Sequence, residues 1–334
     1  MSVEPIPGIQ IGPFLEKHGF RSVSISETQS GRNSRVLKVI GESREAILKA
    51  YHQSSGCLHD RLHAEYSFLT VLSSDPTIPV ATPLGFDGKL ALGLYEMLPG
   101  SAVTEVSEGD VNQASQFIEQ INQLRETDAG KSLGEAAEAC WTFDEHVRVV
   151  TGRVERLLKS LSRQTEPDAW DFVAKSLQPA LQKVLATLAA DDHDHPRLTG
   201  ALSHCKILSP SDFGFHNALR DKDKLWFIDF EYAGWDDPVK LLCDFACQPE
   251  VPVCEEYARQ FWQTLADRLR DEYLVDYAVK LLPLYRIKWC CILLNEFLTT
   301  GGDRRKHANP SDPGKKMLQL AKAKQYFSDH VVTG

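Results

Sequence analysis

The sequence lacks the cysteine spacing of a zinc finger and the basic excess of a general nucleic-acid binder. Its eight cysteines include no C-x2-C pair. Cys243 and Cys247 lie at i and i+4, and Cys290 and Cys291 lie in an apolar run, a pattern that predicts small core residues in a reducing compartment rather than disulfides or metal ligands. The formal net charge is −9, whereas nucleic-acid binding favours an excess of Lys and Arg. A nucleic-acid partner is therefore not expected.

A long uninterrupted apolar run is also missing. The most apolar stretch, residues 281–298, contains Pro283, Arg286 and Lys288 and cannot span a bilayer. The first residues, M-S-V-E-P-I-P-G, have neither a basic start nor an apolar stretch, so no signal peptide is expected. With 43% hydrophobic and 25% charged residues in 334, the composition predicts a cytoplasmic globular protein of one large or two medium domains, with no membrane partner. No pattern indicates an oligomeric state.

What the sequence does contain is a pair of aspartates in surroundings typical of phosphoryl transfer. Asp212 lies five positions before Asn217 in S-D-F-G-F-H-N, and Asp229 ends the apolar run L-W-F-I-D. Phosphoryl transfer needs a carboxylate that orients the attacking hydroxyl and oxygen ligands that hold Mg²⁺ on the phosphates. We predict that the two segments lie at adjacent strand ends, with Asp212 as the catalytic base and Asn217 and Asp229 as the Mg²⁺ ligands.

Residues 212–214 also spell D-F-G, the tripeptide that carries the metal-binding aspartate of protein kinases. That assignment would require a catalytic aspartate upstream with an asparagine five positions after it. The only candidate is Asp194, and the position five residues on is Thr199. The D-F-G assignment therefore fails. His216, beside Asn217, is predicted to have a structural role rather than an acid–base one.

The stretch F-I-D-F-E-Y-A-G-W-D-D-P, residues 227–238, followed by C-D-F-A at 243–246, resembles the metal-binding strand, and the turn after it, of the aminoglycoside phosphotransferase and choline kinase group. These are small-molecule kinases with a protein-kinase-like fold. The resemblance implies an α+β, two-lobed fold, with a mainly β nucleotide-binding N-lobe over residues 1–98 and a mainly helical C-lobe over residues 99–334. The family pattern is H-x-D-x4-N, and Pro210 stands where its histidine would be. In the family that histidine braces the loop, so the resemblance implies that Pro210 affects loop geometry more than the reaction.

In such a fold, residues 22–51 would supply three strands joined by tight turns, because S-V-S-I-S, R-V-L-K-V-I and E-A-I-L-K-A-Y are separated by turn residues. The loop of residues 28–34 would cover the phosphates, with its single glycine Gly31 and Asn33 allowing close backbone approach. Lys49 on the third strand would bind the α- and β-phosphates. Glu65, beside the apolar stripe of a helix over residues 60–72, would turn inward to pair with Lys49. A solvated edge lysine and a surface glutamate are the alternatives.

Residues 89–100, K-L-A-L-G-L-Y-E-M-L-P-G, resemble the strand and hinge between kinase lobes. The backbone groups of Glu96, Met97 and Leu98 would then meet the purine edge. Because backbone would make these contacts, the sequence does not choose between ATP and GTP.

The remainder is predicted to be helical over 110–126, with Asp110 as N-cap, and over 141–162, 168–190, 252–270, 272–299 and 315–330. The resemblance places the acceptor pocket among these helices. Its candidate residues are Trp141, Asp144, Glu145, Trp289, Asn295 and Glu296. Packing and solvation are the commoner roles for such side chains. The cluster D-D-H-D-H at 191–195 could hold a metal, but a polar loop is the more frequent explanation.

Together these features predict an ATP- or GTP-dependent O-phosphotransferase that uses Mg²⁺ to phosphorylate a hydroxyl of a small metabolite, such as a sugar, an amino alcohol or an aminoglycoside. Two other functions stay open. Pro210 and the single-glycine loop are compatible with a catalytically silent nucleotide-binding pseudokinase or scaffold. A protein kinase is disfavoured, because residues 230–250 contain no activation segment ending in an A-P-E-like motif.

Overall fold

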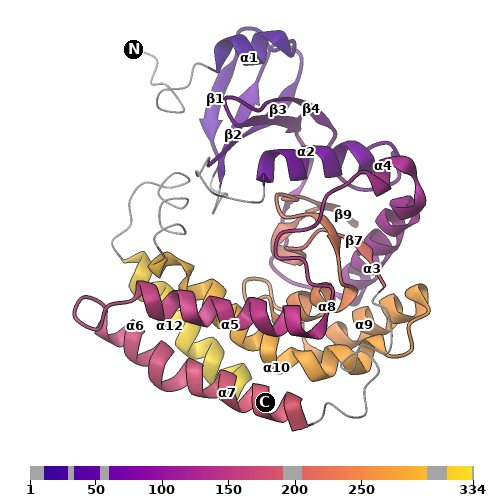
Figure 1. The fold of residues 1–334 in the computed structure, drawn as a ribbon. Helices are drawn as coiled ribbons and strands as arrows, with labels where there is room; N and C mark the ends of the chain where they lie inside the picture. The colour runs from indigo at the N-terminus through magenta and orange to yellow at the C-terminus, as the bar shows by residue number, and fades with distance from the viewer. Residues whose placement is uncertain (1–10, 29–33, 53–59, 191–204, 299–313, 333–334) are drawn as a thin grey trace.

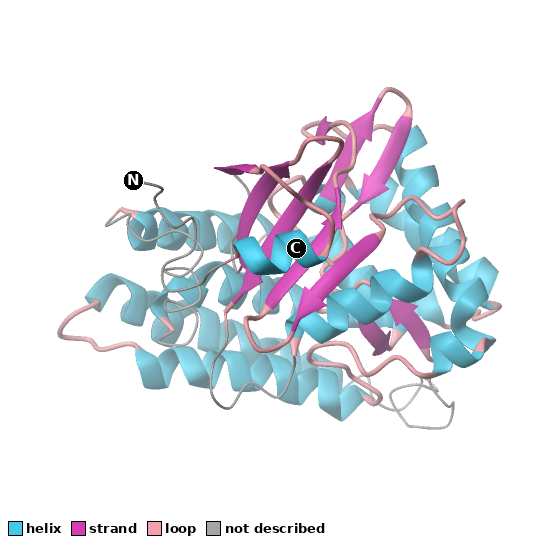
Figure 2. Cartoon of the chain, turned by 90° about the horizontal axis from the view of Figure 1, so that it is seen from above, coloured by secondary structure: helices cyan, strands magenta, loops and turns pink. Residues whose placement is uncertain are grey.

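The structure is a computed structural model that describes residues 11–28, 34–52, 60–190, 205–298 and 314–332. Its N-terminal part is a five-stranded antiparallel sheet in the order β1-β2-β3-β5-β4 (Figures 1 and 2). The strands are β1 Ser24–Glu27, β2 Ser34–Ile40, β3 Glu45–Tyr51, β4 Pro83–Asp87 and β5 Leu92–Glu96. The three strands expected between residues 22 and 51 are therefore confirmed, and β4 is an addition to them.

Alternation along β3 sorts its side chains between two faces of the sheet. Leu48 is fully buried in the cluster on one face, which is covered by α1 (Gly12–Lys17) through Phe14 and Leu15. Lys49 points to the other face, where α2 (Arg61–Leu72) lies. The α2 helix begins where the sequence predicts, because the Asp60 side chain accepts a hydrogen bond from the backbone N–H of His63. The α2 face of the sheet is the one that carries the polar groups of the candidate site.

The rest of the chain is mainly helical. The helices are α3 Glu108–Gln123, α4 Asp128–Lys131, α5 Phe143–Ser160, α6 Pro167–Phe172, α7 Gln178–Ala190, α8 Pro238–Cys247, α9 Glu255–Leu269, α10 Leu274–Leu293 and α12 Lys315–Phe327. The α10 helix packs against α5, α7, α8, α9 and α12, which together form the lower layer in Figure 1. This arrangement, a mainly β part followed by a mainly helical part, confirms the predicted fold class.

Two helix predictions need correction, and one helix was not predicted. Asp110 is not the N-cap of α3: Ser107 is, and Asp110 lies three residues later, where its carboxylate accepts the N–H of Ser107 in a capping box. The segment 168–190 is not one regular helix, because a π-helical turn at Val173–Leu177 separates α6 from α7. The α8 helix was not predicted, although Asp237 as N-cap and Pro238 at the first position are both helix-start signals.

Two small sheets lie between the helices and carry the candidate catalytic loops. In one, β7 (Ile207–Ser209) pairs with β10 (Gly234–Asp236); in the other, β6 (Ser101–Ala102), β8 (Ala218–Asp221) and β9 (Lys224–Phe227) are adjacent. Asp212 follows β7 and Asp229 follows β9. The loop that contains Asp212 and Asn217 runs directly into β8, and Ala218 of β8 pairs with Phe227 of β9. The end of this loop and Asp229 therefore lie at adjacent strand ends, as the sequence predicts.

Phenylalanines from several elements form one core beneath these loops. Phe117 of α3 stacks on Phe227 at 4.3 Å between ring centroids, and Phe245 of α8 stacks on Phe261 of α9 at 4.1 Å. Phe213, next to Asp212, contacts rings of both pairs. Aromatic pairs of this kind contribute about 0.5–1.5 kcal/mol each beyond their burial. The core thus anchors the backbone on either side of the candidate catalytic aspartates.

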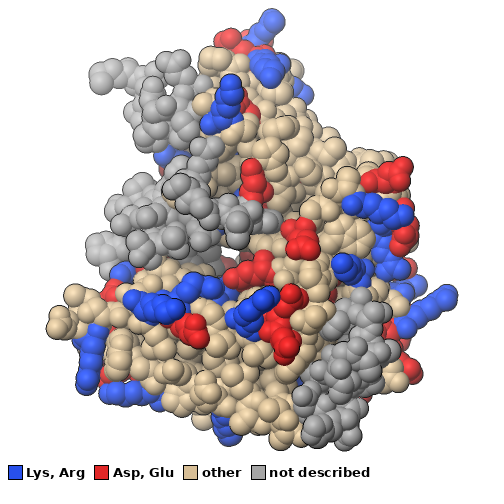
Figure 3. All heavy atoms as spheres, in the orientation of Figure 1, with Lys and Arg blue, Asp and Glu red and all other residues tan. Residues whose placement is uncertain are grey.

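On the face shown in Figure 3, acidic and basic side chains of the described residues are interspersed. No helix among the described residues is long and apolar enough to cross a membrane.

Candidate active site

Lys49 lies between two carboxylates from distant parts of the chain. Its Nζ donates to Glu65 Oε1 and Oε2 at 2.7 and 3.0 Å and to Asp229 Oδ1 at 2.8 Å. Burial by itself lowers the pKa of Lys49, but the Asp229 and Glu65 carboxylates outweigh burial and raise the pKa above its usual value. Lys49 is therefore held as a cation on the inner face of β3. The predicted inward turn of Glu65 is confirmed as a contact.

Glu65 is in turn fixed by two tyrosines. The Tyr51 hydroxyl donates to Glu65 Oε2 at 2.7 Å, and the Tyr95 hydroxyl lies 2.8 Å from that of Tyr51. Because Tyr51 gives its proton to Glu65, Tyr95 is the donor in the second contact. Burial raises the pKa of Glu65, and Lys49 opposes part of that rise. Neither tyrosine was predicted. Tyr51 lies two residues after Lys49, and Tyr95 lies two residues after Gly93, which pairs with Lys49, so both side chains face the same side of the sheet as Lys49. This spacing is visible in the sequence.

Asp229 has a backbone conformation that is uncommon for its residue type. Its φ is 68°, in the left-handed region, where a non-glycine residue is held only by its surroundings. The next residue, Phe230, is 1% exposed and packs against Phe68 of α2. The buried ring anchors the turn, while the Asp229 side chain keeps 38% of its surface exposed. The turn thus presents this carboxylate toward Lys49 and toward solvent together.

One hydrogen bond closes the Asp212 loop, and another joins that loop to the Asp229 loop. Asn217 Nδ2 donates to the Asp212 carbonyl oxygen at 2.9 Å, and the N–H of Ile228 donates to the Asn217 carbonyl oxygen at 3.0 Å. The bond from Ile228 extends the pairing of β8 with β9, whose adjacent ends the sequence predicts. Since Asn217 uses its amide nitrogen within the loop, its Oδ1 is the side-chain atom left for a ligand.

His216 is closer to the candidate base than its predicted role implied. Its Nε2 lies 3.2 Å from Asp212 Oδ1, within hydrogen-bond distance. The Asp212 side chain is 35% exposed, whereas that of His216 is 11% exposed. A largely covered ring beside a partly exposed carboxylate restricts the rotation of that carboxylate. His216 therefore orients Asp212, which is a structural role exercised directly on the candidate base.

Glu231, two residues after Asp229, is a polar residue of the site that sequence reasoning missed. It is 1% exposed and its Oε2 accepts from the Ser34 hydroxyl at 3.0 Å, while Arg61 Nη1 lies 3.9 Å from Oε1. Burial, followed by the neighbouring Asp229 carboxylate, raises the pKa of Glu231 to about 7. Glu231 thus connects the start of β2 to the loop after β9.

Other predicted site residues are placed as follows. Gly31 and Asn33 lie outside the described residues, as does the cluster at 191–195. Glu96 and Met97 are exposed at the end of β5, and Leu98 is 5% exposed. Within the described part of the chain, no group of three or more His, Cys, Asp and Glu is arranged to hold a metal. Mg²⁺ needs only one or two protein oxygen ligands besides the phosphates and water. Asn217 and Asp229 both offer side-chain oxygens, so they fit this ion.

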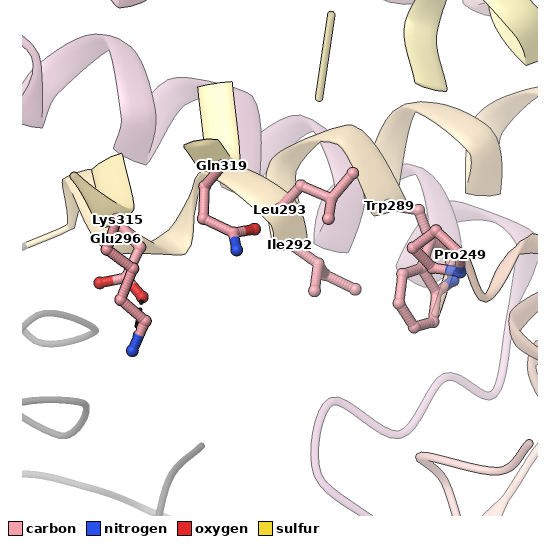
Figure 4. A pocket seen from close by; sticks show the side chains of 7 residues that line it. All are labelled: Pro249, Trp289, Ile292, Leu293, Glu296, Lys315 and Gln319. Atoms are coloured by element: carbon pink, nitrogen blue, oxygen red, sulfur yellow. Dashed lines mark ion pairs between the residues drawn. The ribbon is translucent and has the colours of Figure 1, made fainter. Parts of the chain in front are cut away.

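Two of the acceptor-pocket candidates, Trp289 and Glu296, line one small pocket (Figure 4). Its other lining residues are Pro249, Ile292, Leu293, Lys315 and Gln319. Trp289 Nε1 donates to Asp244 Oδ1 at 2.9 Å, and Glu296 pairs with Lys315 at 3.6 Å. The remaining candidates do not line this pocket.

Of those remaining candidates, Glu145 caps the first turn of α5 through the N–H of Trp141, and Asp144 is exposed. Asn295 lies in the 3-10 turn after α10, beside the pocket residue Glu296.

Comparisons with known proteins identify the family and the fold. A model described as the phosphotransferase enzyme family matches residues 24–280, which include Lys49, Asp212 and Asp229 but not Trp289 or Glu296. No curated protein sequence matches the chain significantly. The fold is similar to that of spectinomycin phosphotransferase in complex with ADP and spectinomycin, with 14% identity, a TM-score of 0.61 and coverage of 95% of this chain and 99% of that one.

Two further solved structures share the fold. Choline kinase from Cryptosporidium parvum Iowa II has 11% identity and a TM-score of 0.55, with coverage of 98% of this chain and 95% of that one. A choline/ethanolamine kinase family protein from Mesorhizobium loti has 13% identity and a TM-score of 0.56, with coverage of 94% and 92%.

Proposed function

The chain belongs to the phosphotransferase enzyme family, and from that premise we propose that it transfers the terminal phosphoryl group of ATP or GTP to a hydroxyl of a small metabolite. The observation that carries the proposal is the cation Lys49 held between Glu65 and Asp229, with the Asp212 loop hydrogen-bonded to the Asp229 loop. A cation, a candidate base and two oxygen donors are the parts that phosphoryl transfer requires.

In this proposal the nucleotide binds between the sheet and the helical part. Lys49 contacts the phosphates, and Glu65 keeps its ammonium in place. The backbone of Glu96, Met97 and Leu98 meets the purine, and the loop that contains Gly31 and Asn33 covers the phosphates. The boundary between a nucleotide-binding lobe and a helical lobe falls near residue 98, just after β5. Oxygen donors support Asn217 and Asp229 as the residues that would hold Mg²⁺, which when bound neutralises phosphate charge.

Asp212 is the proposed base. Its carboxylate is half-open and oriented by His216, so it can accept a hydrogen bond from an acceptor hydroxyl and direct the oxygen toward the phosphate. Positioning and electrostatic stabilisation supply most of the acceleration in such reactions. Pro210, which motivated the pseudokinase hypothesis, replaces none of the groups to which this proposal assigns a role in binding or catalysis.

The acceptor is proposed to be a sugar, an amino alcohol or an aminoglycoside. This range of acceptors is supported by the similarity of the fold to those of a spectinomycin phosphotransferase and a choline kinase. The cytoplasmic location remains a prediction from composition.

The test is ADP release from Mg-ATP and Mg-GTP in the presence of a panel of the three acceptor classes. Thermal-shift titration with each nucleotide, with and without Mg²⁺, runs beside it. We expect a Mg²⁺-dependent shift and acceptor-stimulated ADP release by at least one class. Nucleotide binding without any release above that of Asp212→Asn would instead support the silent nucleotide-binding protein.

A further inference from the structure

A second buried lysine lies directly beneath the candidate catalytic loop. Lys240, in the first turn of α8, is 2% exposed. Its Nζ donates to Asp236 Oδ2 at 2.6 Å and to Ser211 Oγ at 2.9 Å. Ser211 immediately precedes Asp212. The lysine therefore connects a carboxylate on β10 to the residue next to the proposed base.

The carboxylate end of this connection is rigid. Asp236 is fully buried, and its Oδ1 accepts the backbone N–H groups of Cys140 and Asp237 at 3.1 and 2.9 Å. Asp236 also pairs with Ile207 in the register of β10 with β7, the strand that leads into the loop. Burial by itself lowers the pKa of Lys240, but the Asp236 and Asp244 carboxylates together outweigh burial and raise the pKa. Lys240 thus remains charged and fixed.

The loop end of the connection is where the backbone needs support. Ser211 has a φ of 65°, which is unfavourable for a residue with a β-carbon. Pro210 has neither a backbone N–H nor a polar side chain with which to hold the turn. The bonds within the turn are local: the Ser211 N–H donates to Ser209 Oγ, and the Asp212 N–H donates to the Pro210 carbonyl oxygen. The Ser211 hydroxyl joins the turn to α8, because it accepts a hydrogen bond from Lys240, which is ion-paired with Asp236.

We propose that Lys240 is a positioning residue for Asp212, acting through the Ser211 hydroxyl, and that it supplies the bracing that Pro210 cannot. This inference rests on the proposed role of Asp212. It differs from a purely structural ion pair in one respect. A structural pair would stabilise the helical part as a whole, whereas a brace sets the orientation of one carboxylate while leaving nucleotide binding unchanged.

Ser211→Ala separates the two roles. The substitution removes the oxygen that accepts from Lys240, keeps the β-carbon and hence the backbone preference, and leaves the Lys240–Asp236 pair intact. Ser115→Ala is the matched control, because Ser115 is also a buried serine and its hydroxyl donates to the Val111 carbonyl oxygen within α3. Lys240→Met with Asp236→Asn is the second variant, in which both charges are removed together so that neither is left buried alone.

Three measurements are made on the full chain. They are hydrogen exchange of peptides covering residues 207–217, the Kd for Mg-ATP, and kcat for ADP release from Mg-ATP with water and with the most active panel compound as acceptor. For Ser211→Ala we expect faster exchange in the loop, a Kd within a few-fold of wild type, and a kcat lower by about 10–100-fold, as for a misplaced catalytic group. Ser115→Ala should leave all three unchanged.

Several results would overturn the inference: unchanged loop exchange, unchanged kcat despite faster exchange, or a parallel loss of nucleotide binding. An equal effect of Ser115→Ala would do the same. Failure of the proposed function is distinguishable, because wild-type protein would then release no more ADP than Asp212→Asn. In that case exchange still decides whether Lys240 holds the loop, with unchanged exchange overturning the brace and faster exchange supporting it.

Discussion

The Lys49 ammonium and the Asp229 carboxylate, 180 positions apart in the sequence, lie 2.8 Å from each other (Nζ to Oδ1). One comes from the inner face of a strand in the N-terminal sheet and the other from a strained turn in the helical part. Their contact, shared with Glu65 of α2, holds the two parts of the protein together at the proposed phosphate site. Because Lys49 and Asp229 form an ion pair, both side chains are oriented before a nucleotide binds.

Asp229→Ala should abolish the Mg²⁺-dependent component of nucleotide binding, because it removes a proposed metal ligand and an anchor of Lys49. Asp194→Ala, the aspartate that the rejected D-F-G assignment would need, should change little. The measurement is titration of each variant with Mg-ATP, by calorimetry, beside wild type. Loss of binding in Asp194→Ala and retention in Asp229→Ala would mean that the metal and base roles were assigned to the wrong residues.

Tyr51→Phe should weaken nucleotide binding several-fold and lower the free energy of unfolding by about 1 kcal/mol, the usual contribution of a buried hydrogen bond. The reason is that Glu65 loses a donor and then holds Lys49 less firmly. Tyr326→Phe makes the same change in α12, where the hydroxyl donates to the Cys247 carbonyl oxygen. Tyr326→Phe should lower stability without altering nucleotide affinity. Equal affinities for wild type and Tyr51→Phe would exclude the tyrosine from the Lys49 network.

The sequence indicated the site residues that lie on regular elements and missed the connections made by loops. Lys49 was predictable because strand alternation fixes its face, and Glu65 because an apolar stripe fixes the rotation of α2. The contacts of His216 with Asp212 and of Ser34 with Glu231 depend on how irregular segments fold over distant partners. Neither periodicity nor residue type encodes such pairings.

The missed α8 helix illustrates the same limit. Asp237 and Pro238 are helix-start signals, whereas the resemblance of residues 227–238 to a metal-binding strand and the turn after it predicts no helix at this point. The contacts of Lys240 were therefore not predicted. Its pairing with Asp236 and Ser211 requires β7 and β10 to be adjacent, and strands of three residues leave almost no pattern in a sequence.

Glu138 should make the protein lose stability in acid. Burial alone would raise the pKa of this carboxyl, but Arg153, with Lys288, lowers it to about 2. A folded-state pKa below the unfolded value means that the stabilisation is complete above the ordinary Glu pKa of about 4.3 and is lost as pH falls toward the folded value. We expect Glu138→Gln to be less stable than wild type at pH 7. The difference in free energy of unfolding between the two proteins should shrink as pH falls from about 4.3 to about 2.

The measurement is urea unfolding of wild type and Glu138→Gln from pH 3 to pH 8. Glu255→Gln is the control, because Glu255 pairs with Arg259 on the exposed face of α9 and such pairs contribute little. A difference between wild type and Glu138→Gln that grows as pH falls would contradict the assignment.

Asp212→Asn distinguishes an enzyme that works through this loop from one that does not. Asn has nearly the size of Asp and keeps a hydrogen-bonding oxygen, so the bond to His216 and the backbone bond from Asn217 should survive. The variant cannot orient an acceptor hydroxyl by accepting its proton. Turnover should therefore fall by roughly 10²–10⁴, the usual range for removing a positioned acid–base group, while nucleotide affinity stays within a few-fold.

The two quantities are kcat with the most active acceptor and the Kd for Mg-ATP, measured on the same preparation. An unchanged kcat would place the base elsewhere. A collapse of nucleotide binding would make Asp212 a metal ligand, and because Asn217 is tied to the Asp212 carbonyl oxygen, the role of Asn217 would then also have to be reassigned.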